Sequence, residues 1–191
     1  MGIQEHVFQF LKQLADNNYR DWMQENKKQY QSNERELKLF YHDITNQLNK
    51  NDVIDKLKVF RINRDIRFSK DKTPYNVHRS ASWSRQGAER RGGYYLRLEP
   101  GKSMMACGFF SPEKEDLFRI RKEFEFDASE INSILNEEDF AEAFGGFNSE
   151  NALKTAPRGF DKDHENINLI KLKRYVVSHH FSDDEVFSND F

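Results

Sequence analysis

The chain has 191 residues, of which 37% are hydrophobic and 14% aromatic, and its formal net charge at pH 7 is −2. This length favours a single domain over residues 1–191, and the aromatic content is ample for one packed core. No run of about eighteen apolar residues is present, so no membrane span is expected, and the single Cys excludes an internal disulfide and fits a reducing cytoplasm.

Helical periodicity dominates the N-terminal part of the chain. Apolar residues recur at helical spacing over residues 3–15, and Asp16-Asn17-Asn18 then forms a break that can cap the next helix. The helical pattern resumes over residues 19–30 and 37–48. Asn33 and Glu36 have the spacing of a capping box, so this second segment is predicted either as one long helix or as two helices that separate near Ser32.

Alternation replaces helical periodicity at residues 59–68, which predicts a strand with one buried and one polar face. The buried face would carry Phe60, Ile62, Ile66 and Phe68, the polar face Arg61, Asn63, Asp65 and Arg67, and Arg64 falls on the apolar side. Further strands are predicted at residues 77–84, 94–99 and 104–110, separated by a polar turn at 86–93 and a hairpin turn at 100–102. Strands this close in sequence are expected to form an antiparallel meander.

Helical signals return in the C-terminal third. Pro112 begins a predicted helix with acidic residues in its first turn, and the apolar periodicity continues through Phe124. Two short helices are predicted at residues 129–136 and 138–144 and another at 165–177, before an acidic, exposed tail at 182–185. The predicted fold class is α+β, with N-terminal helices, a central antiparallel β-meander of three to four strands and C-terminal helices.

Positive charge is concentrated in the middle of the chain. Residues 56–97 contain twelve Lys or Arg and three Asp or Glu, a net charge of +9, whereas the rest of the chain carries −11. On the polar face of the first strand, Asp65 can neutralise one Arg and leave another free for phosphate or carboxylate, which the guanidinium fork fits. This pattern favours a local anion site over a broad nucleic-acid surface. The alternative is that the charges pair internally, as an ion-pair ladder or with the acidic flanks.

The loop after this strand, residues 69–75, adds hydroxyl and ammonium groups. Pro74 disfavours helical backbone at Thr73, so the segment is expected to be irregular. An irregular loop with exposed amides and hydroxyls can hold a phosphate. The alternative is a solvated turn in which Asp71 pairs with a neighbouring Lys.

Three residues are candidates for proton transfer, namely Asp65, His78 and Glu99. His78 follows the basic loop by three residues and can return beside it, where a His near Arg and Asp can act as a general acid or base. Glu99 shares one side of its predicted strand with Arg97 and would meet the Arg cluster if the two strands are neighbours. A hydrogen-bonded structural His and a salt-bridged Glu are the alternatives.

Neither a metal site nor a cofactor site is expected. His179 and His180 are adjacent, so they point apart in a regular element, and no ligand spacing surrounds them. The segment at residues 101–103 lacks the earlier Gly of a phosphate-binding loop. Cys107 alternates within an apolar strand, as a small core residue does.

Four stretches resemble the markers of domain-of-unknown-function family 2461, conserved hypothetical proteins of bacteria and fungi. They are residues 17–22, 61–75, 93–101 and 157–161, and the resemblance covers almost the whole chain. It implies no established activity. The family's usual Lys after Pro-Tyr is Asn76 here, and its usual His before Glu-Pro-Gly is Arg97, which puts acid–base work at these positions in doubt. The resemblance also implies a further helix beyond Phe191, which this chain is expected to lack.

Three hypotheses about function follow. The first, which we favour, is an intracellular anion-binding domain, with enzymatic activity left open, whose ligand-binding side chains are Arg61, Arg64, Arg67, Ser69, Lys70, Lys72, Thr73, Tyr75, Arg97 and Arg158. The second is a nucleic-acid-binding module with stacking platforms at Tyr75, Trp83, Tyr94 and Tyr95. The third is a structural or interaction module in which the charges pair internally. The expected partner is a small anionic ligand rather than a nucleic acid or a membrane, and the sequence leaves the oligomeric state open.

Overall fold

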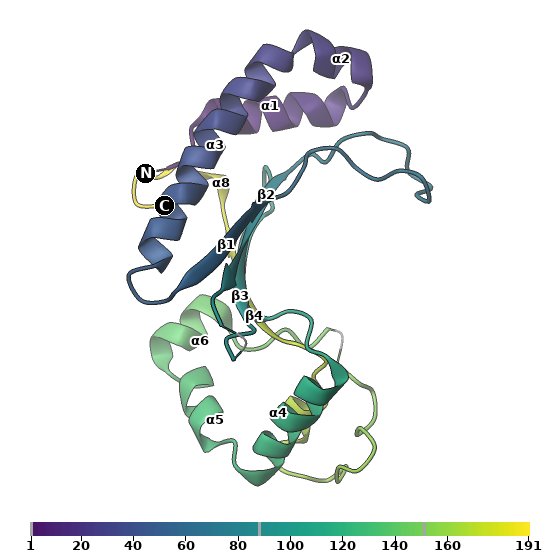
Figure 1. Ribbon diagram of the computed structural model, residues 1–191, viewed down its shortest axis with the longest axis vertical. Helices are drawn as coiled ribbons and strands as arrows, with labels where there is room; N and C mark the ends of the chain where they lie inside the picture. Colours follow the sequence, from purple (N-terminus) through teal and green to yellow (C-terminus); the bar gives the residue numbers. More distant parts are fainter. Residues whose placement is uncertain (1, 88, 151) are drawn as a thin grey trace. The chain divides into compact units, whose positions relative to one another are not determined.

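The computed structural model describes residues 2–87, 89–150 and 152–191 (Figure 1). The chain divides into two compact units. Unit 1 comprises Met1–Arg90, Tyr94–Met105 and His180–Phe191, and unit 2 comprises Arg91–Gly93 and Ala106–His179. The expectation of one domain stays a prediction, because a compact unit is a domain only if it can fold independently.

One antiparallel sheet contains five strands in chain order. The strands are β1 (Ile54–Val59), β2 (Arg79–Arg85), β3 (Gly93–Leu98), β4 (Ser103–Phe109) and β5 (Tyr175–Phe181). The α+β class is confirmed, and the strands predicted at 77–84, 94–99 and 104–110 correspond to β2, β3 and β4. The sheet has one strand more than the predicted three to four because β5 joins it from the C-terminal part of the chain.

The strand β5 overlaps a segment for which the sequence predicted a helix, residues 165–177. Only α7 (Ile167–Ile170) is helical there, and the chain then enters β5 at Tyr175. The strand opens with Tyr175-Val176-Val177, all buried, and aromatic and β-branched residues favour strands. Gly108 lets β4 and β5 approach closely, because a Cβ at this position would clash with the carbonyl of Tyr175.

The strand predicted over residues 59–68 is wrong beyond Val59. β1 ends at Val59 and β2 begins at Arg79, so residues 60–78 form a long loop that we call the arm. Figure 1 shows the arm extending beyond the ends of β1 and β2. The apolar residues of the predicted strand do not share a buried face, since Ile62 is buried and Phe68 is 95% exposed.

Backbone pairing within the arm is sparse. The amide of Arg64 donates to the carbonyl of Pro74 at 2.9 Å, and the amide of Asn76 donates to the carbonyl of Ile62 at 2.7 Å. Pro74 has no N–H to return a hydrogen bond, which interrupts the ladder of a regular hairpin. A single isolated bridge is assigned among the described residues of the arm, between Asn63 and Tyr75.

Helices α1 (Glu5–Asp16), α2 (Arg20–Glu25) and α3 (Lys27–Leu48) lie together on one side of β1 and β2 (Figure 1). The predicted first helix is confirmed, and the next segment breaks at Asn26 rather than near Ser32. Buried side chains of the helices and the sheet form one core, which includes Val7, Phe8, Phe10, Leu11, Leu14, Leu37, Tyr41, Ala81, Trp83, Leu96 and Leu98. Trp83 is 2% exposed, and its indole N–H donates to the Thr45 hydroxyl at 2.8 Å.

The remaining helices lie in both units. In unit 2, α4 (Lys114–Phe126) begins with a capping box formed by Glu113 and Asp116, and it is followed by α5 (Ser129–Leu135) and α6 (Glu138–Phe144), as the sequence predicted. In unit 1, α8 (Asp183–Phe187) occupies the predicted exposed tail, and its Val186 is fully buried. Of the helices in the described ranges, none combines the length and apolar character that a membrane span needs.

A buried ion pair connects α3 to β2. Arg79 donates from Nε and Nη2 to the two carboxylate oxygens of Glu34, at 2.6 and 2.8 Å. Their side chains are only 4% and 17% exposed. This bidentate geometry satisfies both groups in a place where an isolated charge would be costly.

The Glu34→Ala variant is therefore expected to lose about 3–5 kcal/mol of unfolding free energy, because it leaves the Arg79 guanidinium buried without its partner. Urea denaturation followed by circular dichroism measures this change. Asp65→Ala is the matched control, since it removes a carboxylate from an exposed Arg pair and should leave the midpoint nearly unchanged. Equal midpoints for the two variants would contradict the prediction.

Candidate functional site

A groove of about 550 Å³ lies at the base of the arm. Its lining comes from the end of β1, both ends of the arm, the start of β2 and the middle of β3, all in unit 1. The lining residues are Lys58, Val59, Phe60, Arg61, Asn63, Arg64, Asp65, Asn76, His78, Ser80 and Tyr95. Four predicted site residues, Arg61, Arg64, Asp65 and His78, are thus brought together.

Two cations of the groove have no ion-pair partner among the described residues, Lys58 and Arg61. Both side chains are exposed. The Lys58 ammonium lies 4.8 Å from the centroid of the Phe60 ring, which in turn packs edge-on against Tyr95 at 6.1 Å. The groove therefore presents two positive charges beside an aromatic wall.

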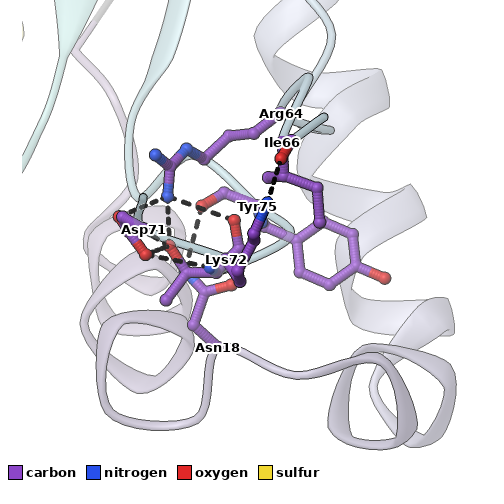
Figure 2. Close-up of polar contacts among 7 residues, drawn as sticks. Asn18, Arg64, Ile66, Asp71, Lys72 and Tyr75 are labelled. Atoms are coloured by element: carbon purple, nitrogen blue, oxygen red, sulfur yellow. Dashed lines mark hydrogen bonds and ion pairs between the residues drawn. The ribbon is translucent and has the colours of Figure 1, made fainter. Parts of the chain in front are cut away.

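Arg64, in contrast, is held inside the arm (Figure 2). Its Nη1 donates to a carboxylate oxygen of Asp71 at 2.6 Å, to the carbonyl of Thr73 at 3.1 Å and to the Thr73 hydroxyl. The Thr73 amide and the Arg64 guanidinium both donate to Asp71 and lower the pKa of its carboxyl to about 2. Lys72 adds a further bond, from its ammonium to the carbonyl of Ile66 at 3.0 Å. These contacts take the place of the missing backbone ladder.

Arg67 and Asp65 also pair with each other. The guanidinium donates from Nε and Nη2 to the two oxygens of Asp65, at 2.9 and 2.7 Å. These hydrogen bonds lower the pKa of the Asp65 carboxyl and raise that of Arg67. Both side chains are largely exposed, at 77% for Arg67 and 61% for Asp65. The acid of the predicted site is thus bonded to Arg67, and the Arg61 guanidinium has no ion-pair partner in the part of the chain that the structure describes.

His78 is half-buried in the groove. Burial lowers the pKa of its imidazole below the usual value, because desolvation disfavours the charged form. The carboxylate of Glu99 opposes this shift, and the guanidinium groups of Arg97 and Arg79 add to it. The neutral form of His78 is therefore favoured near pH 7, and a neutral imidazole can accept a proton.

Arg97 and Glu99 are not among the residues that line the groove. The Arg97 Nε lies 3.3 Å from a Glu99 carboxylate oxygen, and its Nη2 donates to the carbonyl of Lys102 at 3.3 Å. The two residues thus pair with each other at the end of β3. Their charges act on His78, which lines the groove.

The base of the arm is tied to the turn between α1 and α2 by Asn18. Its side-chain amide donates to the carbonyl of Tyr75 at 2.9 Å, and its Oδ1 accepts from the Tyr75 amide at 3.1 Å (Figure 2). This reciprocal pair was not predicted as part of the site. The only sequence signal for it was the position of Asn18 within the family-like stretch at residues 17–22.

The other predicted ligand-binding residues do not line the groove. The arm holds five of them outside the groove lining, namely Ser69, Lys70, Lys72, Thr73 and Tyr75. Lys72 and Thr73 bond to other residues of the arm, and Tyr75 bonds to Asn18. Arg158 is exposed in a loop of unit 2. Conversely, Lys58, Asn76 and Ser80 line the groove and were not candidates. Lys58 lies in β1 and Ser80 in β2, so their approach depends on how these strands pair, whereas the amide of Asn76 is bonded to the carbonyl of Ile62 within the arm.

The groups dismissed as metal ligands or nucleophiles have other contacts. His179 Nδ1 lies 2.6 Å from the carbonyl of Ala143. Burial raises the pKa of the Cys107 thiol, so the reactive thiolate is less populated near pH 7. Across residues 2–87, 89–150 and 152–191, no cluster of three or more His, Cys, Asp or Glu side chains is arranged to hold a metal ion.

Comparison with known proteins identifies a family whose description names no activity. The search of curated proteins found no match to the chain, and neither did the search of solved structures. A family model described as conserved hypothetical protein (DUF2461) matches residues 6–191, nearly the whole chain. The resemblance predicted from the stretches at residues 17–22, 61–75, 93–101 and 157–161 is thereby confirmed. The protein belongs to the DUF2461 family.

Proposed function

We propose that the protein binds a small anionic ligand, bearing a phosphate or carboxylate group, in the groove at the base of the arm. The observation that carries this proposal is the guanidinium of Arg61, which has no ion-pair partner among the described residues, whereas Arg64 and Arg67 are both bonded to carboxylates. An Arg fork without an internal partner is suited to bind a planar or tetrahedral oxyanion. Lys58 supplies a second charge at the same groove.

Neutral hydrogen-bonding groups complete the proposed site. Asn63, Asn76 and Ser80 line the groove beside Arg61, and their amides and hydroxyl can donate to ligand oxygens. His78 can exchange a proton with a bound ligand, so any acid–base chemistry would start from this residue.

Two hypotheses from the sequence receive less support: a nucleic-acid-binding module that stacks bases on the four named aromatic residues, and a module in which all charges pair internally. Trp83 lies in the core and cannot stack on a base, and the Tyr94 hydroxyl donates to Asp52 at 2.8 Å. Internal pairing describes most arginines of the basic segment, but Arg61 has no such partner among the described residues.

Sulfate, a tetrahedral oxyanion, can serve as the probe for the site. The Arg61→Ala variant is expected to weaken sulfate binding roughly tenfold or more, because a charge-assisted hydrogen bond to the anion is lost. Isothermal titration calorimetry or amide chemical shifts measure the affinity. Arg35→Ala is the matched control, since Arg35 is exposed on α3 and outside the groove. Equal weakening in both variants would indicate a general effect of net charge and would contradict a site at Arg61.

The Asn76→Lys variant tests the same site in the opposite direction. It adds a cation to the groove lining, so sulfate should bind more tightly and the Arg61→Ala defect should be partly compensated. The affinities of the single and double variants measure this compensation. An affinity that stays at the wild-type value would place the anion elsewhere.

The pKa of His78 should lie below 6.5 in the free protein and should rise when sulfate binds, since a bound anion favours the imidazolium. Because the folded-state pKa is lowered, the unfolded state takes up the proton first, and unfolding free energy should fall as pH drops below 6.5. NMR titration of the ring protons measures the pKa, and His78→Asn assigns the signal. A pKa of 6.5 or higher in the free protein would be inconsistent with this environment.

A further inference from the structure

Phe68 is the most exposed large apolar residue that the structure describes, at 95%. It lies on the arm, whose shape is maintained by polar contacts of its neighbours: Arg64 with Asp71, and Lys72 with the carbonyl of Ile66. The arm therefore keeps its shape without packing Phe68 against the core. A single exposed apolar side chain is normal on a protein surface, so the case for a partner depends on the groups that surround the ring.

The charges around Phe68 indicate the chemistry of that partner. Residues 60–78 carry five Lys or Arg and two Asp, a net charge of +3. Both acids are already bonded within the arm, Asp65 to Arg67 and Asp71 to Arg64. Arg61 and Lys70 have no ion-pair partner among the described residues, so the arm offers cations to an external polyanion.

One group of the arm, the Arg67 guanidinium, already contacts the ring of Phe68. The Arg67 guanidinium carbon lies 6.0 Å from the ring centroid, within the range of a cation–π contact. Since the side chain is 95% exposed, the ring remains accessible to a second planar group. A nucleobase stacks on such a ring regardless of its identity, with the cation supporting the pair from the other side.

We infer that the anionic ligand of the groove is part of a single-stranded nucleic acid, whose phosphate lies at Arg61 and Lys58 and one of whose bases stacks on Phe68. This inference rests on the proposed function, because it places a phosphate in the same groove. Phe60 at the groove and Phe68 are eight residues apart, at most about 29 Å for a fully extended chain. An oligonucleotide of a few nucleotides can bridge a span of this size and reach both places.

Other partners fit the arm less well. A membrane surface needs several apolar side chains or a lipid anchor for stable binding, and Phe68 is the one large apolar residue of the arm that is strongly exposed among those described. A protein partner typically buries a patch of apolar residues around its anchor, whereas the sequence neighbours of Phe68 on the arm are charged or polar. A strand of phosphates and bases matches both the isolated ring and the isolated cations.

Fluorescence anisotropy with a labelled dT oligonucleotide of about twelve nucleotides tests the inference. Phe68→Ala should weaken binding about five- to a hundredfold, and Phe68→Trp should retain it, because an indole also stacks. Phe126→Ala is the matched control, since Phe126 is 89% exposed at the end of α4 and should not affect binding. Lys70→Ala should make the plot of log K against log salt less steep by about 0.7, as expected for the loss of one contact to a single strand.

Sulfate binding to the same variants separates the two proposals. Phe68→Ala should leave sulfate affinity unchanged, whereas Arg61→Ala should weaken both sulfate and oligonucleotide. If sulfate binds at Arg61 but the oligonucleotide does not bind, or binds equally to wild type and Phe68→Ala, the inference is overturned and the anion site stands. Binding to anionic phospholipid vesicles that depends on Phe68, without oligonucleotide binding, also overturns it. If neither sulfate nor oligonucleotide binds, both proposals fail.

Discussion

The shape of the arm depends on the hydrogen bonds that the Arg64 guanidinium donates to Asp71 and Thr73. Beyond Asn63 and Tyr75 the two sides of the arm no longer pair as strands, and side chains must hold them together. Arg64 does so from one side, by donating to the carboxylate of Asp71 and to both oxygens of Thr73 on the other. A rigid fork with several donors is well suited to this task, and the shorter reach and single ammonium of Lys would not reproduce it.

The bracing of the arm also determines which charges remain available for a ligand. Each Asp of the arm accepts from an Arg, and each of these pairs is local, two or seven residues apart in the chain. The mixture of acids and cations that suggested a shaped anion site in the sequence is therefore largely internal structure. Among the described residues, the arginine of the arm that has no ion-pair partner is Arg61, at the edge of a groove whose other walls come from β1, β2 and β3.

The sequence predicted most helices and the strands β2 to β4, because each has a clear periodicity and is bounded by turn residues. It could not predict the arm. An alternating segment such as residues 59–68 is a strand only if another strand pairs with it, and Pro74 limits that pairing. The sequence showed the charged candidates of the groove as a cluster. It could not show which neighbouring arginine pairs with Asp65, because that depends on side-chain geometry. The approach of Lys58 and Ser80 depends on strand register, which local periodicity does not reveal.

The reciprocal hydrogen bonds between Asn18 and Tyr75 have a mechanical consequence. They join the turn after α1 to a part of the chain 57 residues further on, directly beside the residue that lines the groove at position 76. The turn between α1 and α2 therefore anchors the base of the arm. A substitution of Asn18 would remove this anchor without changing any residue that lines the groove.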